Sequence, residues 1–327
     1  MEVPAALIEA LRDQYMVERE IGHGAMATVY LARDVRHDRQ VAVKVLHAEL
    51  AAGLGPERFE REIRLAAQLQ HPLIVPLIDS GRTNGTLYYV MPFIRGESLR
   101  TRLDREGQLP IDEASRILSE VADALAHAHE QGFVHRDVKP ENVLISGGHA
   151  MVTDFGIAKA IGAAAGSQGA TTAGMAIGTP AYMAPEQAAA DPAADHRVDI
   201  YALGTLAYEL IAGRPPFAGR RAHAVIVAHA TEPPPLLSSH RPDVPPRLAA
   251  LVERCMSKSP NDRPQTATEV SAGLRAFTAS SGETESDAVE TAASVAAPVR
   301  AEEPRRPLLI AVAVLLALAI LVAVLYA

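Results

Sequence analysis

The sequence has 327 residues, which allows one large domain or two smaller ones with attached segments. Hydrophobic residues make up 48% of it and charged residues 21%, as in ordinary globular proteins. The net charge of -8 disfavours nucleic acid as a partner, because affinity for a phosphate backbone comes from clustered Lys and Arg side chains. The single cysteine, Cys255, excludes an intrachain disulfide and fits a reducing compartment.

Residues 15–92 have the pattern of a small, mostly β lobe. The run VAVKVL at 41–46 alternates and is β-branched, which predicts a strand, and the spacing of apolar residues predicts a helix over 57–70. Gly22 and Gly24 stand between two strand-like segments. Such a turn lets backbone N–H groups approach phosphates, although a plain hairpin turn would explain two glycines equally well.

Lys44 is the one cation in the strand at 41–46. A lysine in an otherwise buried strand needs an anionic partner to offset its desolvation. A nucleotide phosphate and a carboxylate would both serve. Glu62, on the predicted helix, is the candidate carboxylate, with a solvent-exposed Glu62 as the alternative.

Residues 93–277 are dominated by helical periodicity. Asp112 is placed to cap a helix whose apolar positions face inward, and Val198–Ile211 has the composition of a buried helix. This part therefore predicts a second, mostly α lobe, and the whole of 15–277 an α+β fold.

The segments HRDVKPENVL at 135–144 and TDFG at 153–156 place Asp137, Lys139, Asn142 and Asp154 within one short span. Phosphoryl transfer needs these groups: a carboxylate to accept the proton of the acceptor hydroxyl, an amide and a second carboxylate to hold Mg²⁺, and cations to balance the phosphate oxygens.

With these motifs, the chain resembles the eukaryotic-type (Hanks-type) protein kinase superfamily over 15–277, in particular the bacterial membrane-anchored Ser/Thr protein kinases. The resemblance implies a two-lobed kinase fold, ATP as the donor, and Mg²⁺ or Mn²⁺ as the metal. It makes Asp137 the catalytic base and Lys139 the residue that steadies the transferred phosphoryl group, with Asn142 and Asp154 as metal ligands. Lys139, two positions after the base, indicates serine or threonine as the acceptor in protein substrates.

The resemblance also implies which residues surround ATP. Lys44, paired with Glu62, would contact the α- and β-phosphates, and Met91 would guard the adenine pocket. Ala27 departs from the family pattern where a third glycine is usual, and Pro92 departs in the hinge, where it lacks an N–H. The full set is Ile21, Gly22, His23, Gly24, Ala25, Met26, Ala27, Thr28, Val29, Lys44, Glu62, Met91, Pro92 and Ile94.

Further matches imply structural and regulatory roles. Asp199 resembles a prop for the catalytic loop, and Glu186 and Arg263 are expected to form an ion pair. Arg136 would dock a phosphate on the activation segment, for which Thr171 and Thr172 are the candidate sites. The alternative is that both threonines are ordinary residues of a Gly/Ala-rich loop.

The C-terminal part has a different composition. Residues 278–307 are rich in Ser, Ala, Glu and Pro, which predicts a disordered tether. Residues 308–327 form a run of 20 residues without a charge, long enough as a helix to cross a bilayer, with a buried core helix as the alternative. Arginines at 300, 305 and 306 place the preceding kinase domain in the cytoplasm. We therefore expect a single-pass cell-membrane protein in which two copies phosphorylate each other.

Two rival functions remain at this point. A catalytically inactive, membrane-tethered nucleotide-binding scaffold is opposed by the retention of Lys44, Asp137, Asn142 and Asp154. A kinase of small molecules is opposed by GTPAYMAPE at 178–186, which in the family shapes a peptide-docking site.

Overall fold

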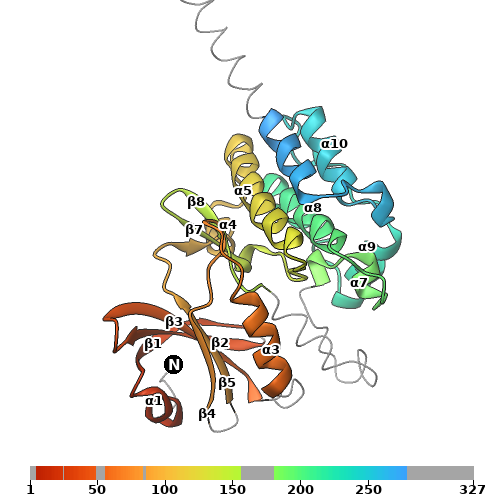
Figure 1. The fold of residues 1–327 in the computed structure, drawn as a ribbon. Helices are drawn as coiled ribbons and strands as arrows, with labels where there is room; N and C mark the ends of the chain where they lie inside the picture. The colour runs from red at the N-terminus through yellow and green to blue at the C-terminus, as the bar shows by residue number, and fades with distance from the viewer. Residues whose placement is uncertain (1–4, 25, 49–55, 84–85, 156–179, 278–327) are drawn as a thin grey trace, which may run out of the picture. The chain divides into compact units, whose positions relative to one another are not determined.

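The computed structural model describes residues 5–24, 26–48, 56–83, 86–155 and 180–277. These residues form a strand-rich N-terminal lobe and a helix-rich C-terminal lobe (Figure 1). The α+β, two-lobed architecture expected from the sequence is confirmed.

The N-terminal lobe is built on a five-stranded antiparallel sheet in the order β1-β2-β3-β5-β4. The strand predicted at 41–46 is the greater part of β3, between β2 and β5. The elements of this lobe are β1 (Tyr15–His23), β2 (Ala27–Asp34), β3 (Arg39–Leu46), β4 (Asp79–Thr83), β5 (Thr86–Pro92), α1 (Ala5–Leu11) and α3 (Pro56–Ala66).

The two faces of this sheet pack against different helices. Because side chains alternate along a strand, β5 contributes to both faces. Tyr89 and Met91 lie in one buried cluster with Phe59 of α3. Tyr88 lies in another with Leu7 of α1. This alternation directs Tyr89 toward the α3 side of the sheet and Tyr88 away from it.

Helix α3 ends earlier than its sequence pattern predicts. The pattern extends to residue 70, but the helix ends at Ala66 and a turn follows. Leu69 is buried after that turn in the core of the C-terminal lobe, together with Ile74. Leu69, which lies beyond the end of the helix, is therefore used for packing between the lobes.

The C-terminal lobe contains most of the hydrophobic core and a small three-stranded sheet in the order β6-β7-β8. A last helix covers residues 267–277. The other elements are β6 (Glu97–Ser98), α4 (Leu99–Glu106), α5 (Ile111–Glu130), η1 (Pro140–Asn142), β7 (Val143–Ser146), β8 (His149–Val152), η2 (Pro180–Tyr182), α7 (Pro185–Ala188), α8 (Arg197–Ala212), α9 (Ala222–Thr231), η3 (Leu237–Ser239), α10 (Pro246–Cys255) and η4 (Pro260–Asp262).

Helices α5 and α8 form the centre of this core. The predicted buried helix at 198–211 is confirmed, since every residue in that range of α8 is buried. The inward face predicted for α5 is also confirmed. Asp112 does not cap α5: Pro110 occupies the N-cap position, so Asp112 lies in the first turn, where its charge favours the positive end of the helix dipole.

The segments predicted as a tether and a membrane helix, 278–307 and 308–327, lie outside the described residues. In the part of the chain that the structure describes, no helix has the length and apolar character needed to cross a membrane.

Candidate active site

The loop at 135–142, which is the predicted catalytic loop, is supported by Asp199 of α8. This fully buried carboxylate accepts the backbone N–H groups of His135, at 2.8 Å, and Arg136, at 2.7 Å. His129 contributes a third contact, 2.8 Å from its Nε2. Burial alone would raise the pKa of Asp199, but these partners lower it below its ordinary value, so the side chain is ionised at neutral pH.

Arg136 adopts a left-handed backbone conformation, with a φ of 65°. This conformation is uncommon outside glycine and needs support from its surroundings. Asp199 supplies that support through the N–H of Arg136, and the Nε2 of Gln187 donates to its carbonyl at 2.8 Å. The strained residue immediately precedes Asp137, so these contacts set the direction of the catalytic loop.

Asp137 is the centre of a small polar cluster. The Nζ of Lys139 lies 2.7 Å from its Oδ2. The amide of Asn142 donates to the Asp137 carbonyl at 2.8 Å and to Oδ2 at 3.0 Å. The structure thus brings together three of the residues that the sequence singled out.

His135 joins this loop to the TDFG segment. Its Nδ1 accepts the N–H of Asp137 at 3.2 Å, so its Nε2 carries the proton and donates to the carbonyl of Thr153 at 2.9 Å. His135 is fully buried. The sequence analysis assigned no role to His135 or His129. The only sign of one was that these histidines lie in or just before the HRDVKPENVL segment.

Asp154 forms a polar contact between the lobes. Its Oδ2 lies 2.6 Å from the Nζ of Lys44, and its Oδ1 accepts the hydroxyl of Tyr89 at 2.6 Å. Burial alone would raise the pKa of Asp154, but these two donors bring it below the ordinary value. The carboxylate is therefore charged at neutral pH.

The pair expected between Lys44 and Glu62 is not formed. Among the described residues Lys44 has its ion pair with Asp154, and Glu62 stays half-buried on α3. The physical requirement behind the prediction is met by a different partner: the partly buried ammonium group needs one close carboxylate, and Asp154 supplies it from the other lobe.

The end of β1 and the turn to β2 contain the two glycines that the sequence singled out, Gly22 and Gly24. The N–H of Gly24 bonds to the carbonyl of Ala27 at 2.9 Å, which closes the turn. Neither Gly22 nor Gly24 has a positive φ, and a Cβ added at either would meet no atom closer than 3.7 Å. Neither a positive φ nor crowding therefore requires glycine at these two positions, and their contact with phosphates stays a prediction. Ala25 lies outside the described residues.

Apolar side chains from both lobes form one cluster beside this turn. Ile21 and Val29 pack against the group that contains Ala42 and Met91, and Leu144 of β7 joins from the C-terminal lobe. Met26 and Ile94 pack against the same cluster, and Thr28 is buried on β2. That these residues surround adenine stays a prediction.

The hinge after Met91 follows the sheet closely. Pro92 is the register partner of Val41, and the N–H of Phe93 donates to the carbonyl of Gln40 at 3.3 Å. Pro92 and Ile94 are half-buried. Their contacts with adenine remain predictions.

The residues present fit a divalent cation. Asn142 uses its NH₂ group on Asp137, which leaves its carbonyl oxygen, and Asp154 is ionised. Amide and carboxylate oxygens are the ligands that Mg²⁺ and Mn²⁺ accept.

Comparison with known proteins decides the family. The family model described as "Protein kinase domain" matches residues 15–272. This chain belongs to the protein kinase family. Its catalytic loop and TDFG segment lie within the matched range.

The relatives described below are bacterial proteins. The chain is 42% identical over 272 residues to the serine/threonine-protein kinase PknB of Mycolicibacterium smegmatis, covering 81% of this chain and 43% of that protein. PknB of Mycobacterium leprae is 41% identical, with the same coverage of 81% and 43%. A probable serine/threonine-protein kinase of Corynebacterium efficiens is 38% identical over 307 residues, covering 91% and 44%. The chain thus spans less than half the length of these relatives.

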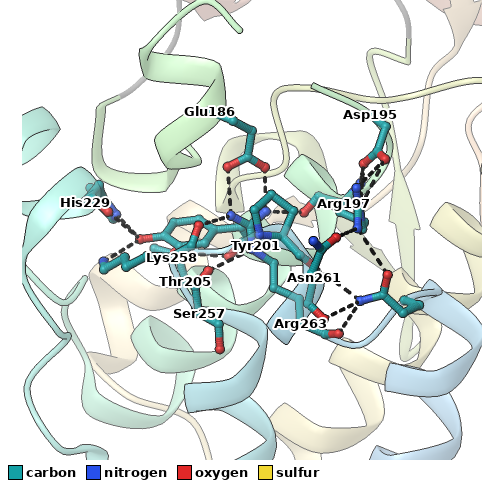
Figure 2. Close-up of polar contacts among 12 residues, drawn as sticks. Glu186, Asp195, Arg197, Tyr201, Thr205, His229, Ser257, Lys258, Asn261 and Arg263 are labelled. Carbon is teal, nitrogen blue, oxygen red and sulfur yellow. Dashed lines mark hydrogen bonds and ion pairs between the residues drawn. The ribbon is translucent and has the colours of Figure 1, made fainter. Parts of the chain in front are cut away.

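The kinase domain also contains the expected ion pair between Glu186 and Arg263. The two N–O distances are 2.6 and 2.7 Å, and Arg263 is fully buried (Figure 2). Arg263 donates further to the carbonyls of Arg197, Ser257 and Lys258. This pair holds α7, whose first two residues are the last two of the segment expected to dock peptides.

The activation segment is only partly described. Thr171, Thr172, Gly178 and Thr179 lie outside the described residues. Arg136, the expected phosphate-docking residue, has a buried Nε without a hydrogen-bond partner in the described part of the chain.

Proposed function

We propose that this chain is an ATP-dependent protein kinase that transfers the γ-phosphoryl group to serine or threonine hydroxyls of proteins. The observation that carries the proposal is the convergence of Lys44 and Asp154 from two lobes beside the cluster around Asp137. The scaffold alternative requires a chain that keeps this whole arrangement without using it.

The geometry supports a division of roles. Asp137, with its carboxylate oriented by Asn142 and Lys139, would accept the proton of the substrate hydroxyl. Lys139 would balance charge on the transferred group, and Lys44 would balance charge on the α- and β-phosphates. A divalent cation, when bound at Asn142 and Asp154, supplies neutralisation of the phosphate oxygens.

An assay with labelled ATP, a generic protein acceptor and Mg²⁺ or Mn²⁺ tests the proposal. We expect label on serine and threonine of the acceptor. Nucleotide binding without any incorporation would favour the scaffold, and transfer only to small acceptors would favour a small-molecule kinase.

We propose activation by phosphorylation of Thr171 or Thr172, carried out by a second copy of the chain. The buried Nε of Arg136, which has no hydrogen-bond partner among the described residues, supports this, because a phosphate is a strong acceptor for such a donor. Mass spectrometry before and after phosphatase treatment should locate phosphate at one of these threonines. The inactive Asp137→Asn variant should gain it only when mixed with active protein. An active enzyme without phosphate between residues 160 and 178 would contradict the proposal.

We also propose that residues 308–327 anchor the chain in the cell membrane, with the kinase domain cytoplasmic. The uncharged run and the preceding arginines support this. In cell fractionation, the full chain should be in the membrane fraction and a chain lacking 308–327 in the soluble fraction. A double substitution, Ala313→Arg with Val314→Arg, should act like the deletion. An unchanged distribution in both variants would refute the anchor.

A further inference from the structure

Tyr89 places a hydroxyl group in a largely apolar part of the site. The residue is 1% exposed and shares its cluster with Leu87 and Met91, its neighbours on the same face of β5. A buried hydroxyl lowers stability unless it is hydrogen-bonded. Its one hydrogen bond among the described residues is the 2.6 Å contact with Oδ1 of Asp154. Phenylalanine would fill the same space, so packing alone does not explain the hydroxyl.

Tyr89 and Lys44 act on Asp154 as a pair. They are register partners on the neighbouring strands β5 and β3, and both side chains reach the same carboxylate. Lys44 donates to Oδ2 and Tyr89 to Oδ1. Two donors from one rigid sheet fix both the position and the rotation of the carboxylate, which a single donor could not do.

The two hydrogen bonds from Lys44 and Tyr89 leave Asp154 able to bind a metal ion. A carboxylate has about four lone-pair positions on its two oxygens. Among the described residues each oxygen has one donor, which leaves one position per oxygen for a metal ion. Asp154 itself has a φ of 69°, an uncommon conformation for a residue other than glycine. A backbone in that state benefits from a side chain that is held at both oxygens.

We propose that Tyr89 is a positioning residue for Asp154 and that its hydroxyl sets the affinity of the site for the divalent cation. The inference rests on the proposed function, in which Asp154 is a metal ligand. Hydrogen bonds to metal ligands orient them, and their loss typically weakens metal affinity or activity about 10- to 100-fold.

Tyr89→Phe removes only the hydroxyl, and Tyr88→Phe is its matched control. Tyr88 precedes it on the same strand and is also buried, but it belongs to the cluster on the opposite face, with its hydroxyl over Gly81. Both variants make the same chemical change in the same strand. Only one of them touches Asp154.

The decisive measurement is Mn²⁺ binding to the full chain with a non-hydrolysable ATP analogue, followed by electron paramagnetic resonance. We expect the Mn²⁺ dissociation constant to rise about tenfold or more in Tyr89→Phe and to stay close to wild type in Tyr88→Phe. The melting temperature with and without Mn²⁺ is the second readout: the increment due to the metal should shrink only in Tyr89→Phe.

Two results would overturn the inference. One is an unchanged Mn²⁺ dissociation constant in Tyr89→Phe. The other is a melting temperature lowered equally with and without metal, which would mean that the hydroxyl only supports packing. Either result could occur although the wild-type chain phosphorylates protein. The inference about Tyr89 can therefore be wrong while the proposed function holds. If wild type transfers no phosphate, the proposed function fails, although the difference in Mn²⁺ affinity remains measurable.

Discussion

Replacing Asp137 with asparagine should lower kcat for phosphoryl transfer by about 10²- to 10⁴-fold, the usual contribution of a general base. The amide has nearly the same shape as the carboxylate and can still accept from Asn142. It cannot take the proton of the acceptor hydroxyl, and it loses the ion pair with Lys139. The fold should therefore persist while the chemistry fails. Steady-state kinetics with labelled ATP measure the loss.

Glu141→Gln is the matched control for this prediction. Glu141 lies in η1, four residues after Asp137, and its half-exposed side chain contacts Arg100. The chemical change is the same, but the carboxylate does not belong to the cluster around Asp137. Its kcat should stay near wild type. A small loss in Asp137→Asn, comparable to that of the control, would remove Asp137 from the role of base.

Local patterns were enough to predict much of the fold and of the site. The strand at 41–46 follows from its alternation, and the helix at 198–211 follows from its apolar composition. Asp137, Lys139 and Asn142 lie within six consecutive residues, so their convergence needs only a loop of the right shape. Such short-range features depend little on how distant elements pack.

The contacts of Asp154 could not be predicted in the same way. Its partners Lys44 and Tyr89 are 110 and 65 residues away in the sequence. Whether Lys44 meets Asp154 or Glu62 depends on how α3 and the two lobes lie against each other, which no local pattern encodes. Tyr89 by itself reads as one more apolar position in an alternating strand. Its function becomes visible only when the register of β3 and β5 is known.

Besides the loss of kcat in Asp137→Asn, the other large expected effect is a loss of folding stability. Glu186→Ala should lower the free energy of unfolding by about 3–5 kcal/mol, because removal of one partner from a buried ion pair leaves the other charge uncompensated. Arg263 is fully buried and cannot reach water without disturbing the carbonyls of Ser257 and Arg197. Such a loss is a large part of the 5–15 kcal/mol that ordinarily holds a domain folded. Urea denaturation of the full chain, followed by circular dichroism, gives the free energies.

Two further variants test whether the stability lost in Glu186→Ala comes from the uncompensated charge of Arg263. Glu232→Ala removes a carboxylate from the solvent-exposed pair with Arg220, and it should leave the urea midpoint near that of wild type. Combining Glu186→Leu with Arg263→Met removes both charges and should recover part of the stability lost in Glu186→Ala. The recovery should stay incomplete, because three backbone carbonyls then lose the donors of Arg263. If Glu186→Ala instead matched Glu232→Ala, the penalty would not come from an uncompensated buried charge, and Arg263 would have to find water or another acceptor when its partner is removed.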